Sequence, residues 1–131
     1  MSPEHGFRGT VSAGEKIHSL IDRKTGIPYF SLYGKSKKPT KEMLQGIDVL
    51  VFDIQAIGVR SYTYISTLGL VMETAAENNI ELVILDRPNP LGGLRVEGNN
   101  LDPKYKSFIG MYPIPYVYGL TIGELALMIN E

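Results

Sequence analysis

The stretch Val49-Leu50-Val51-Phe52-Asp53 places four large apolar residues in a row and ends them with an aspartate. Such a run leaves no polar face for solvent, so residues 47–54 are predicted to form a buried strand. A second run, Leu82-Val83-Ile84-Leu85, ends in the same way at Asp86 and predicts a strand over residues 80–85. These two runs decide the fold, because the segment between them fixes how they pair.

That segment has the spacing of an amphipathic helix, expected over residues 62–78 with Asn78-Asn79 as its stop signal. Its apolar positions at helical spacing are Ile65, Leu68, Met72, Ala75 and Ala76. A strand, a helix and a strand in this order form a right-handed crossover whose strands run parallel. The sequence therefore predicts a doubly wound α/β fold, an open sheet of mainly parallel strands with helices on both faces.

Further elements flank this unit. Residues 29–33 have strand composition, and Thr40 is expected to cap a short helix after them. Residues 89–118 are too rich in proline and glycine for regular structure, which predicts a long loop of the kind that often carries function. A last helix is expected after them, because Thr121-Ile122-Gly123-Glu124 has the spacing of a capping box.

The composition fits one soluble globular domain and excludes several functions. Of the 131 residues, 44% are hydrophobic and 21% are charged, which favours a folded core over disorder. The formal net charge of −1 provides no broad field for nucleic acid or anionic lipid. The absence of cysteine excludes disulfides and a thiolate nucleophile, and no apolar run approaches the ~20 residues of a membrane span. The chain opens into a polar loop and closes inside a helix, so we expect a fold truncated at both ends.

The first cluster of chemically capable residues is the loop Pro3-Glu4-His5-Gly6, with Arg8 close behind. Glu4 and His5 are adjacent titratable groups that burial and neighbours can tune for general acid or base catalysis. Arg8 is suited to bind a carboxylate or to pair with Glu4. The alternative is a surface loop with a structural salt bridge, since such clusters also occur for structural reasons.

The second cluster begins where the first apolar run ends. Asp53 there is a candidate functional carboxylate, or a cap for the turn that follows, and Gln55 comes next to it. Arg60, Tyr62 and Tyr64 then alternate in a way that suits a stacking and hydrogen-bonding wall for a sugar. The alternative for the tyrosines is an ordinary position at the edge of the core.

The third cluster, Asp86-Arg87-Pro88-Asn89-Pro90, follows the second apolar run. Its prolines fix neighbouring polar groups at little entropic cost, as a preorganised site requires, although a sharp structural turn explains the same residues. Asp86, Arg87 and Asn89 are candidate substrate-binding residues, and Glu97 and Asn99, soon after them, extend the candidate sugar wall.

Several classes of site have no signature here. No Gly-x-Gly-x-x-Gly follows a strand, and neither a P-loop nor a Gly-x-Ser-x-Gly elbow is present. His5 and His18 lack helical i, i+4 spacing, so a metal site would need distant carboxylates. We therefore expect no cofactor and no metal, and a nucleotide-dependent Rossmann enzyme is disfavoured.

Taken together, the motifs of the chain resemble those of the YbbC-like family, the exo-β-N-acetylmuramidases called NamZ, and they stand in the family's order. Any one of them alone is weak, and the set is specific. The motifs are Pro3-Glu4-His5-Gly6-Phe7-Arg8-Gly9, Ser31-Leu32-Tyr33-Gly34, Phe52-Asp53-Ile54-Gln55, Gly58-Val59-Arg60 with Tyr62-Thr63-Tyr64-Ile65, Asp86-Arg87-Pro88-Asn89-Pro90-Leu91-Gly92-Gly93, Glu97-Gly98, and Tyr112-Pro113-Ile114-Pro115 with Gly119-Leu120-Thr121-Ile122-Gly123-Glu124-Leu125.

The resemblance implies that residues 1–131 are part of a Rossmann-like N-terminal catalytic domain. In full-length relatives a separate C-terminal domain follows, and the active site lies in the cleft between the two. The implied reaction is exo-hydrolysis of a terminal N-acetylmuramic acid from the non-reducing end of peptidoglycan fragments. Muramyl saccharides are then the substrates, and the full-length protein is expected to be extracellular or periplasmic.

Carried over by position, Glu4 is the catalytic carboxylate with His5 beside it. The other residues that match family motif positions are Asp53, Arg60, Tyr62, Asp86, Arg87 and Asn89. The chain departs from the family at Ala56, where relatives commonly have an acidic residue, and at Val117-Tyr118, where they commonly have Arg-His.

Glycoside hydrolysis commonly needs an acid that protonates the leaving oxygen and a second carboxylate. Glu4 is the expected acid and Asp53 or Asp86 its partner, unless the substrate's own N-acetyl group is the nucleophile. Arg60 or Arg87 is suited to recognise the lactyl carboxylate that distinguishes muramic acid. The alternative function is a non-catalytic carbohydrate-binding or interaction domain derived from the same fold.

Overall fold

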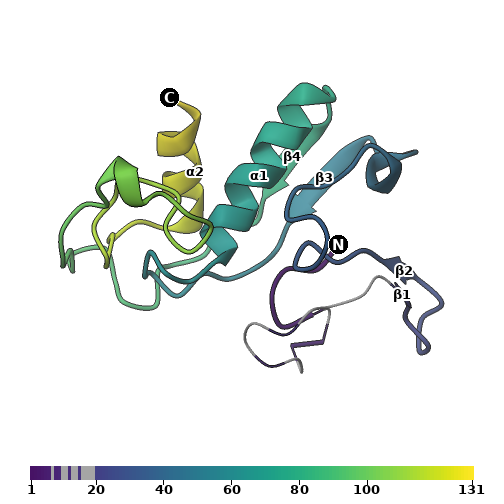
Figure 1. Cartoon of the computed structure of the whole chain (residues 1–131), viewed down its shortest axis with the longest axis horizontal. Helices are drawn as coiled ribbons and strands as arrows, with labels where there is room; N and C mark the ends of the chain where they lie inside the picture. The colour runs from purple at the N-terminus through teal and green to yellow at the C-terminus, as the bar shows by residue number, and fades with distance from the viewer. Residues whose placement is uncertain (7, 10–11, 13–14, 16–19) are drawn as a thin grey trace. The chain divides into compact units, whose positions relative to one another are not determined.

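The computed structural model describes residues 1–131 apart from residues 7, 10–11, 13–14 and 16–19. The chain divides into two compact units, Met1–Ile47 and Asp48–Glu131. Figure 1 labels the helices and strands of both units.

The first unit is built from short strand pairings. Strand β1 (Leu20–Ile21) pairs antiparallel with β2 (Pro28–Tyr29), with Leu20 opposite Tyr29. The strand predicted over residues 29–33 is shorter than expected, because only Tyr29 of that range belongs to β2, while Ser31 forms an isolated parallel bridge with Ser2. The polar loop after Ser2 therefore follows a parallel pairing, as a site loop in an α/β fold does.

A 3-10 helix, η1 (Glu42–Leu44), follows in the same unit. Its N-cap is Lys41, which makes no side-chain capping hydrogen bond, so the prediction of Thr40 as the cap is wrong. The helix is also a single turn. Gly46 stands after it with φ of 74°, a left-handed conformation that glycine adopts without steric cost.

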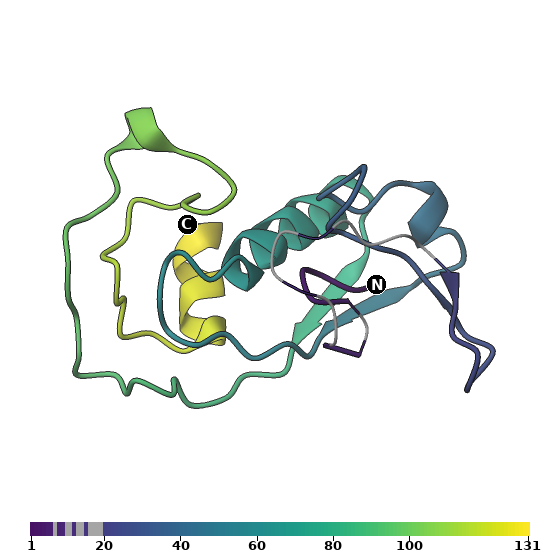
Figure 2. The ribbon, with the colours of Figure 1, turned by 60° about the horizontal axis from the view of Figure 1, so that its bottom comes forward.

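The second unit confirms the predicted β-α-β arrangement. Strand β3 (Val49–Phe52) and strand β4 (Glu81–Ile84) pair in parallel, with Val49 opposite Glu81 and Phe52 opposite Ile84. Helix α1 (Tyr64–Glu77) connects them and packs against β4, as Figure 2 shows from another side. The fold is α/β with a parallel sheet and two helices, α1 and α2 (Ile122–Asn130).

The predicted burial of β3 is wrong for one of its faces. Phe52 is 4% exposed, but Val51 is 59% exposed and Val83 on β4 is 37% exposed. The side chains alternate across the strands, so Phe52, Leu82 and Ile84 pack on the core while the valines point to the opposite face. Both faces of the strand pair are apolar, and in this unit α1 packs on one of them.

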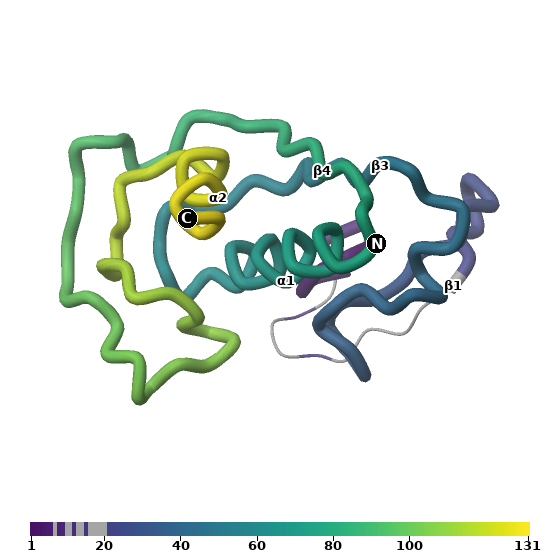
Figure 3. Tube along the Cα trace, turned by 90° about the horizontal axis from the view of Figure 1, so that it is seen from above, coloured from purple at the N-terminus to yellow at the C-terminus, as the bar shows by residue number. Residues whose placement is uncertain are grey.

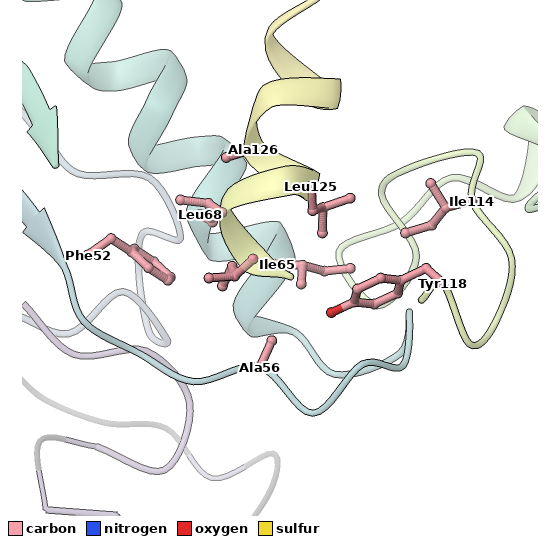
Figure 4. Packing of buried hydrophobic residues seen from close by; sticks show 9 residues of the cluster. Phe52, Ala56, Ile65, Leu68, Ile114, Tyr118, Leu125 and Ala126 are labelled. Atoms are coloured by element: carbon pink, nitrogen blue, oxygen red, sulfur yellow. The ribbon is translucent and has the colours of Figure 1, made fainter. Parts of the chain in front are cut away.

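The core of the second unit joins both helices, β3 and the long loop. Figure 4 shows Ile65 and Leu68 of α1 against Leu125 and Ala126 of α2. Phe52 reaches the same cluster from β3, and Ile122 belongs to it at the start of α2. Ala56 joins it from the segment between β3 and α1, and Ile114 and Tyr118 join it from the long loop. Burial of these apolar side chains makes the core the main source of stability for the unit.

The predicted long loop lies between β4 and α2 and contains η2 (Pro103–Tyr105). In Figure 3 it runs outward and returns beside α2. It is fixed by backbone pairing, since Val117 forms antiparallel bridges with both Val59 and Glu97. Among the described residues, no helix is long and apolar enough to cross a membrane.

A glycine on α1 lets this loop approach the helix. A Cβ on Gly69 would lie 1.5 Å from the Tyr112 hydroxyl, so only glycine leaves room for that ring. Burial there raises the pKa of Tyr112 to about 12, and the charge of Glu73 adds to the effect. The glycine costs about 1 kcal/mol of helix propensity relative to alanine, which the packing of Tyr112 offsets.

The core assignment predicts a sharp difference between two leucine substitutions. Leu68 is 0% exposed, so Leu68→Ala should lower the free energy of unfolding by about 2–5 kcal/mol through lost contacts and a residual cavity. Leu127 on α2 is 71% exposed, so Leu127→Ala should change it by less than about 0.5 kcal/mol. Urea unfolding followed by far-UV circular dichroism measures both, and equal costs would contradict the assigned core.

Candidate functional site

The Glu4 loop follows directly from the parallel pairing of Ser2 with Ser31. The Ser2 amide donates to the Phe30 carbonyl at 2.8 Å, and the Leu32 amide donates to the Ser2 carbonyl at 2.8 Å. This register places Glu4 and Tyr33, each two residues further on, at the same edge of the pairing. Glu4 forms a side-chain hydrogen bond with Tyr33, which raises the pKa of the Tyr33 hydroxyl.

His5 occupies a strained position in this loop. The Gly6 amide donates to the Pro3 carbonyl at 3.2 Å, and His5 within that turn has φ of 71°. A residue with a Cβ is disfavoured there by roughly 1–2 kcal/mol, and glycine would be the ordinary choice. Strain of this kind is concentrated at functional sites, so the conformation supports a role for the His5 imidazole beside Glu4.

Arg8 forms an ion pair with Asp22. One guanidinium nitrogen, Nη2, lies 2.8 Å from each carboxylate oxygen of Asp22. Thr25 donates to the same carboxylate through its amide at 3.0 Å and its hydroxyl at 2.6 Å. These bonds, the Thr25 hydroxyl first and Arg8 second, hold the pKa of Asp22 below its ordinary value. Asp22 was not among the predicted site residues, because its contact with Arg8 joins residues 14 positions apart.

Asp53 and Arg87 come together at the carboxyl ends of β3 and β4. Each follows its strand, and the parallel register sets the two chain ends side by side. The Arg87 guanidinium forms an ion pair with the Asp53 carboxylate. Both side chains are about half exposed, 44% for Arg87 and 55% for Asp53, so the pair is accessible to a ligand.

Asp86 is engaged at the start of α2. The Thr121 hydroxyl donates to one of its oxygens at 2.7 Å, and the Gly123 amide donates to the other at 2.8 Å. Desolvation raises the pKa of Asp86, but these bonds and one from the Arg87 amide outweigh it, so the pKa lies below its ordinary value. Thr121 and Glu124 also form the predicted capping box, so the start of α2 is held by two carboxylates.

Asn89 joins the two ends of the long loop through its amide group. Its nitrogen donates to the Leu120 carbonyl at 2.9 Å, and its oxygen accepts from the Leu91 amide at 2.9 Å. A Cβ on Gly58 would lie 2.3 Å from the same oxygen, which explains glycine there. Through these contacts, Asn89 holds the segment after β4 to the segment before α2. Its predicted part in substrate binding stays a prediction.

The Arg60 guanidinium contacts two backbone carbonyls and an aromatic ring of the long loop. Its Nη1 donates to the Asn99 carbonyl at 2.8 Å and to the Ile114 carbonyl, and its guanidinium lies 5.9 Å from the ring centre of Tyr116. The Tyr116 hydroxyl in turn lies 2.9 Å from the Ser61 hydroxyl. Arg60 thus ties the long loop to the start of α1.

The remaining predicted site residues lie in the second unit. Tyr62 and Tyr64 meet edge to face with ring centres 4.5 Å apart. The Gln55 amide donates to the neighbouring Ala56 carbonyl at 2.6 Å, and Glu97 receives two bonds from Arg95, the shorter 2.6 Å. Their places in a substrate wall stay predictions.

The positions at which the chain departs from the family's pattern are buried. Ala56 is 3% exposed and Tyr118 is 5% exposed, and both belong to the core cluster. Val117 is 6% exposed and pairs with Glu97 and Val59. Small and apolar side chains at these positions pack the core, where an unpaired charge would be costly.

The structure therefore forms two groups of candidate residues. Glu4, His5 and Tyr33 lie together in the first unit, and Asp53 lies with Arg87 in the second. Within the described residues, no group of three His, Cys, Asp or Glu side chains is arranged to hold a metal ion. Tyr33 is the neighbour that the sequence did not assign, because its place beside Glu4 depends on the pairing of Ser2 with Ser31.

A known protein family matches the whole length of this chain. The chain matches, over residues 1–131, the family described as exo-beta-N-acetylmuramidase NamZ, N-terminal. It is 57% identical over 129 residues to the peptidoglycan beta-N-acetylmuramidase NamZ of Bacillus subtilis (strain 168), covering 98% of this chain and 31% of that protein.

Two crystal structures of DUF1343 family proteins from Bacteroides fragilis NCTC 9343 are also similar. One is 60% identical with a TM-score of 0.85, covering 98% of this chain and 32% of the other. The second is 48% identical with a TM-score of 0.76, covering 84% of this chain and 30% of the other. The chain thus spans about a third of the length of these relatives.

The contacts of Asp86 predict a pH-dependent penalty for Asp86→Asn. A carboxylate with a lowered pKa stabilises the fold above the ordinary carboxyl pKa, and this contribution is lost as the pH falls through the lowered value. Asp86→Asn should therefore cost about 1 kcal/mol of unfolding free energy at pH 7, a typical capping loss, and less at an acidic pH below the lowered pKa.

Urea unfolding at both pH values measures this difference. Asp48→Asn, at an exposed aspartate just before β3, is the control and should change little at either pH. A penalty for Asp86→Asn that is the same at both pH values would show that its charge does not contribute.

Proposed function

The chain belongs to the family of exo-β-N-acetylmuramidase NamZ N-terminal domains, and from this membership we propose that it serves as the N-terminal catalytic domain of a glycoside hydrolase. The proposed enzyme is the full-length protein, in which a C-terminal domain accompanies this one. Its proposed reaction is the release of terminal N-acetylmuramic acid from the non-reducing ends of peptidoglycan fragments. The relative from Bacillus subtilis, named a peptidoglycan beta-N-acetylmuramidase, supports this substrate class.

The observation that carries the proposal is the setting of Glu4. It is half-buried in a loop that follows a parallel pairing, with a tyrosine hydroxyl bonded to it and a strained histidine next to it. A carboxyl group in such a place can exchange a proton with a ligand while its orientation is fixed. We assign Glu4 as the acid that protonates the leaving glycosidic oxygen, and His5 as its neighbour in the site.

Asp53 is the proposed second carboxylate. Both oxygens of Asp86 accept hydrogen bonds from the start of α2, whereas Asp53 is 55% exposed and contacts Arg87. A glycosidase with two carboxylates holds them about 5–10 Å apart, the shorter range for a nucleophile and the longer for a base that activates water. The proposal therefore requires this separation between Glu4 and Asp53 in the full-length enzyme.

Arg87 is the proposed ligand of the lactyl carboxylate. Arg60 already donates to two backbone carbonyls and lies over the Tyr116 ring, so it is less free to rotate toward a substrate. Arg87 is 44% exposed and has five N–H donors, of which Asp53 occupies one side. Recognition of the substrate carboxylate by the remaining donors would also place the sugar beside Asp53.

The assignment of Glu4 predicts the result of a conservative substitution. Glu4→Gln keeps the size of the side chain but removes its titratable proton, so in the full-length protein it should lower turnover of N-acetylmuramyl-N-acetylglucosamine by on the order of 10²-fold or more. Glu81→Gln, at an exposed glutamate at the start of β4, is the matched control and should keep wild-type turnover.

Release of N-acetylmuramic acid, measured by chromatography, gives the result directly. Wild-type turnover by the Glu4→Gln protein would remove Glu4 from the mechanism. Binding of the disaccharide without turnover by the wild-type protein would favour the alternative of a non-catalytic carbohydrate-binding domain.

A further inference from the structure

We propose that Tyr33 is a positioning residue for Glu4, donating its hydroxyl to the Glu4 carboxylate and fixing where that group lies at the end of the paired chain segments. The sequence places Tyr33 in a recognised motif, and nothing in the motif states what its side chain does. The catalytic part of this inference rests on the proposed function, while the hydrogen bond itself does not.

The backbone geometry brings the two side chains together. Ser2 and Ser31 form a parallel bridge, with hydrogen bonds of 2.8 Å on both sides of Ser2. Glu4 and Tyr33 are each two residues beyond this bridge, in the turn and the bend that follow the paired residues. The hydrogen bond between their side chains joins the two segments at this point.

The backbone around Tyr33 is itself fixed. The Tyr33 amide donates to the Ser31 hydroxyl at 3.1 Å, and Ser31 and Leu32 are 6% and 3% exposed. Tyr33 and Glu4 are each half-buried, so a ligand can reach the carboxyl group while the phenol remains in place. The hydrogen bond and the charge of Glu4 both raise the pKa of Tyr33, as expected when a hydroxyl donates to a carboxylate.

This contact has a defined consequence for acid catalysis. A hydrogen bond to the charged form of a carboxyl group favours that form, so Tyr33 keeps the pKa of Glu4 lower than it would be without the hydroxyl. The other titratable groups near Glu4 on its own loop are His5 and Arg8, and Arg8 is bonded to Asp22. Tyr33 adds a donor to Glu4 from the neighbouring segment, and this hydrogen bond fixes the direction of the carboxyl group.

The substitution Tyr33→Phe isolates the hydroxyl, because the ring and its packing remain. In the full-length protein it should lower kcat on the muramyl disaccharide by on the order of 10-fold, with KM nearly unchanged. The limb of the pH–rate profile that belongs to Glu4 should move to higher pH. Tyr105→Phe, at a tyrosine that is 68% exposed, is the matched control and should leave both unchanged.

A double-mutant cycle separates positioning from a structural role. If Tyr33 acts through Glu4, Tyr33→Phe should have no further effect on turnover in a Glu4→Gln protein, whereas a structural role would lower turnover in both backgrounds. Carbon-detected NMR titration of the Glu4 carboxyl group tests the hydrogen bond without activity, and it should show a higher pKa in the Tyr33→Phe protein.

The outcomes distinguish the two proposals. An unchanged Glu4 titration, or wild-type kcat and pH profile in the Tyr33→Phe protein, would overturn the role of Tyr33 while leaving the function of Glu4 in place. A different result would be wild-type turnover by the Glu4→Gln protein together with a shifted Glu4 titration in the Tyr33→Phe protein. This result would support the hydrogen bond, but it would overturn the proposed function and with it the catalytic role of Tyr33.

Discussion

Parallel pairing of chain segments is the constraint on which the rest of this structure depends. When two strands run the same way, the residues that follow them leave the sheet at one edge, where side chains are no longer committed to the sheet. The chain uses this twice. Ser2 with Ser31 sets Glu4 beside Tyr33, and β3 with β4 sets Asp53 beside Arg87. Both groups of reactive side chains thus follow from backbone register.

Some polar residues of the chain hold its segments together by hydrogen bonds, and others are accessible to a ligand. Asp86, Asn89 and Arg60 lie in motifs of the family, yet each makes hydrogen bonds that join β4, the long loop and the helix starts. Asp22 does the same in the first unit by binding Arg8 and Thr25. Glu4 and the pair of Asp53 with Arg87 lie where a ligand can reach them. A family motif therefore contains residues that hold the fold together and residues that a ligand can reach. The structure is needed to tell one kind from the other.

Local patterns predicted much of the fold. The apolar runs ending at Asp53 and Asp86 and the helical spacing between them give the parallel β-α-β unit, and the capping box marks the start of α2. What failed depended on packing partners. Val51 lies in an apolar run that predicts a buried strand, yet its side chain is exposed. Its burial depends on what covers that face of the sheet, and the run itself does not indicate this. The contact of Asp22 with Arg8 joins residues 14 positions apart, and no local pattern indicates it. The same holds for the hydrogen bond between Glu4 and Tyr33.

We propose that Glu4 and Asp53 act on one glycosidic bond in the full-length protein. The most direct test of this claim is a crystal structure of the full-length protein carrying Glu4→Gln, with N-acetylmuramyl-N-acetylglucosamine bound. We expect a separation of about 5–10 Å between the side-chain carbonyl carbon at position 4 and the Asp53 carboxyl carbon, with the glycosidic oxygen within hydrogen-bonding distance of position 4. A separation well beyond about 10 Å, or a disaccharide bound away from both residues, would contradict it.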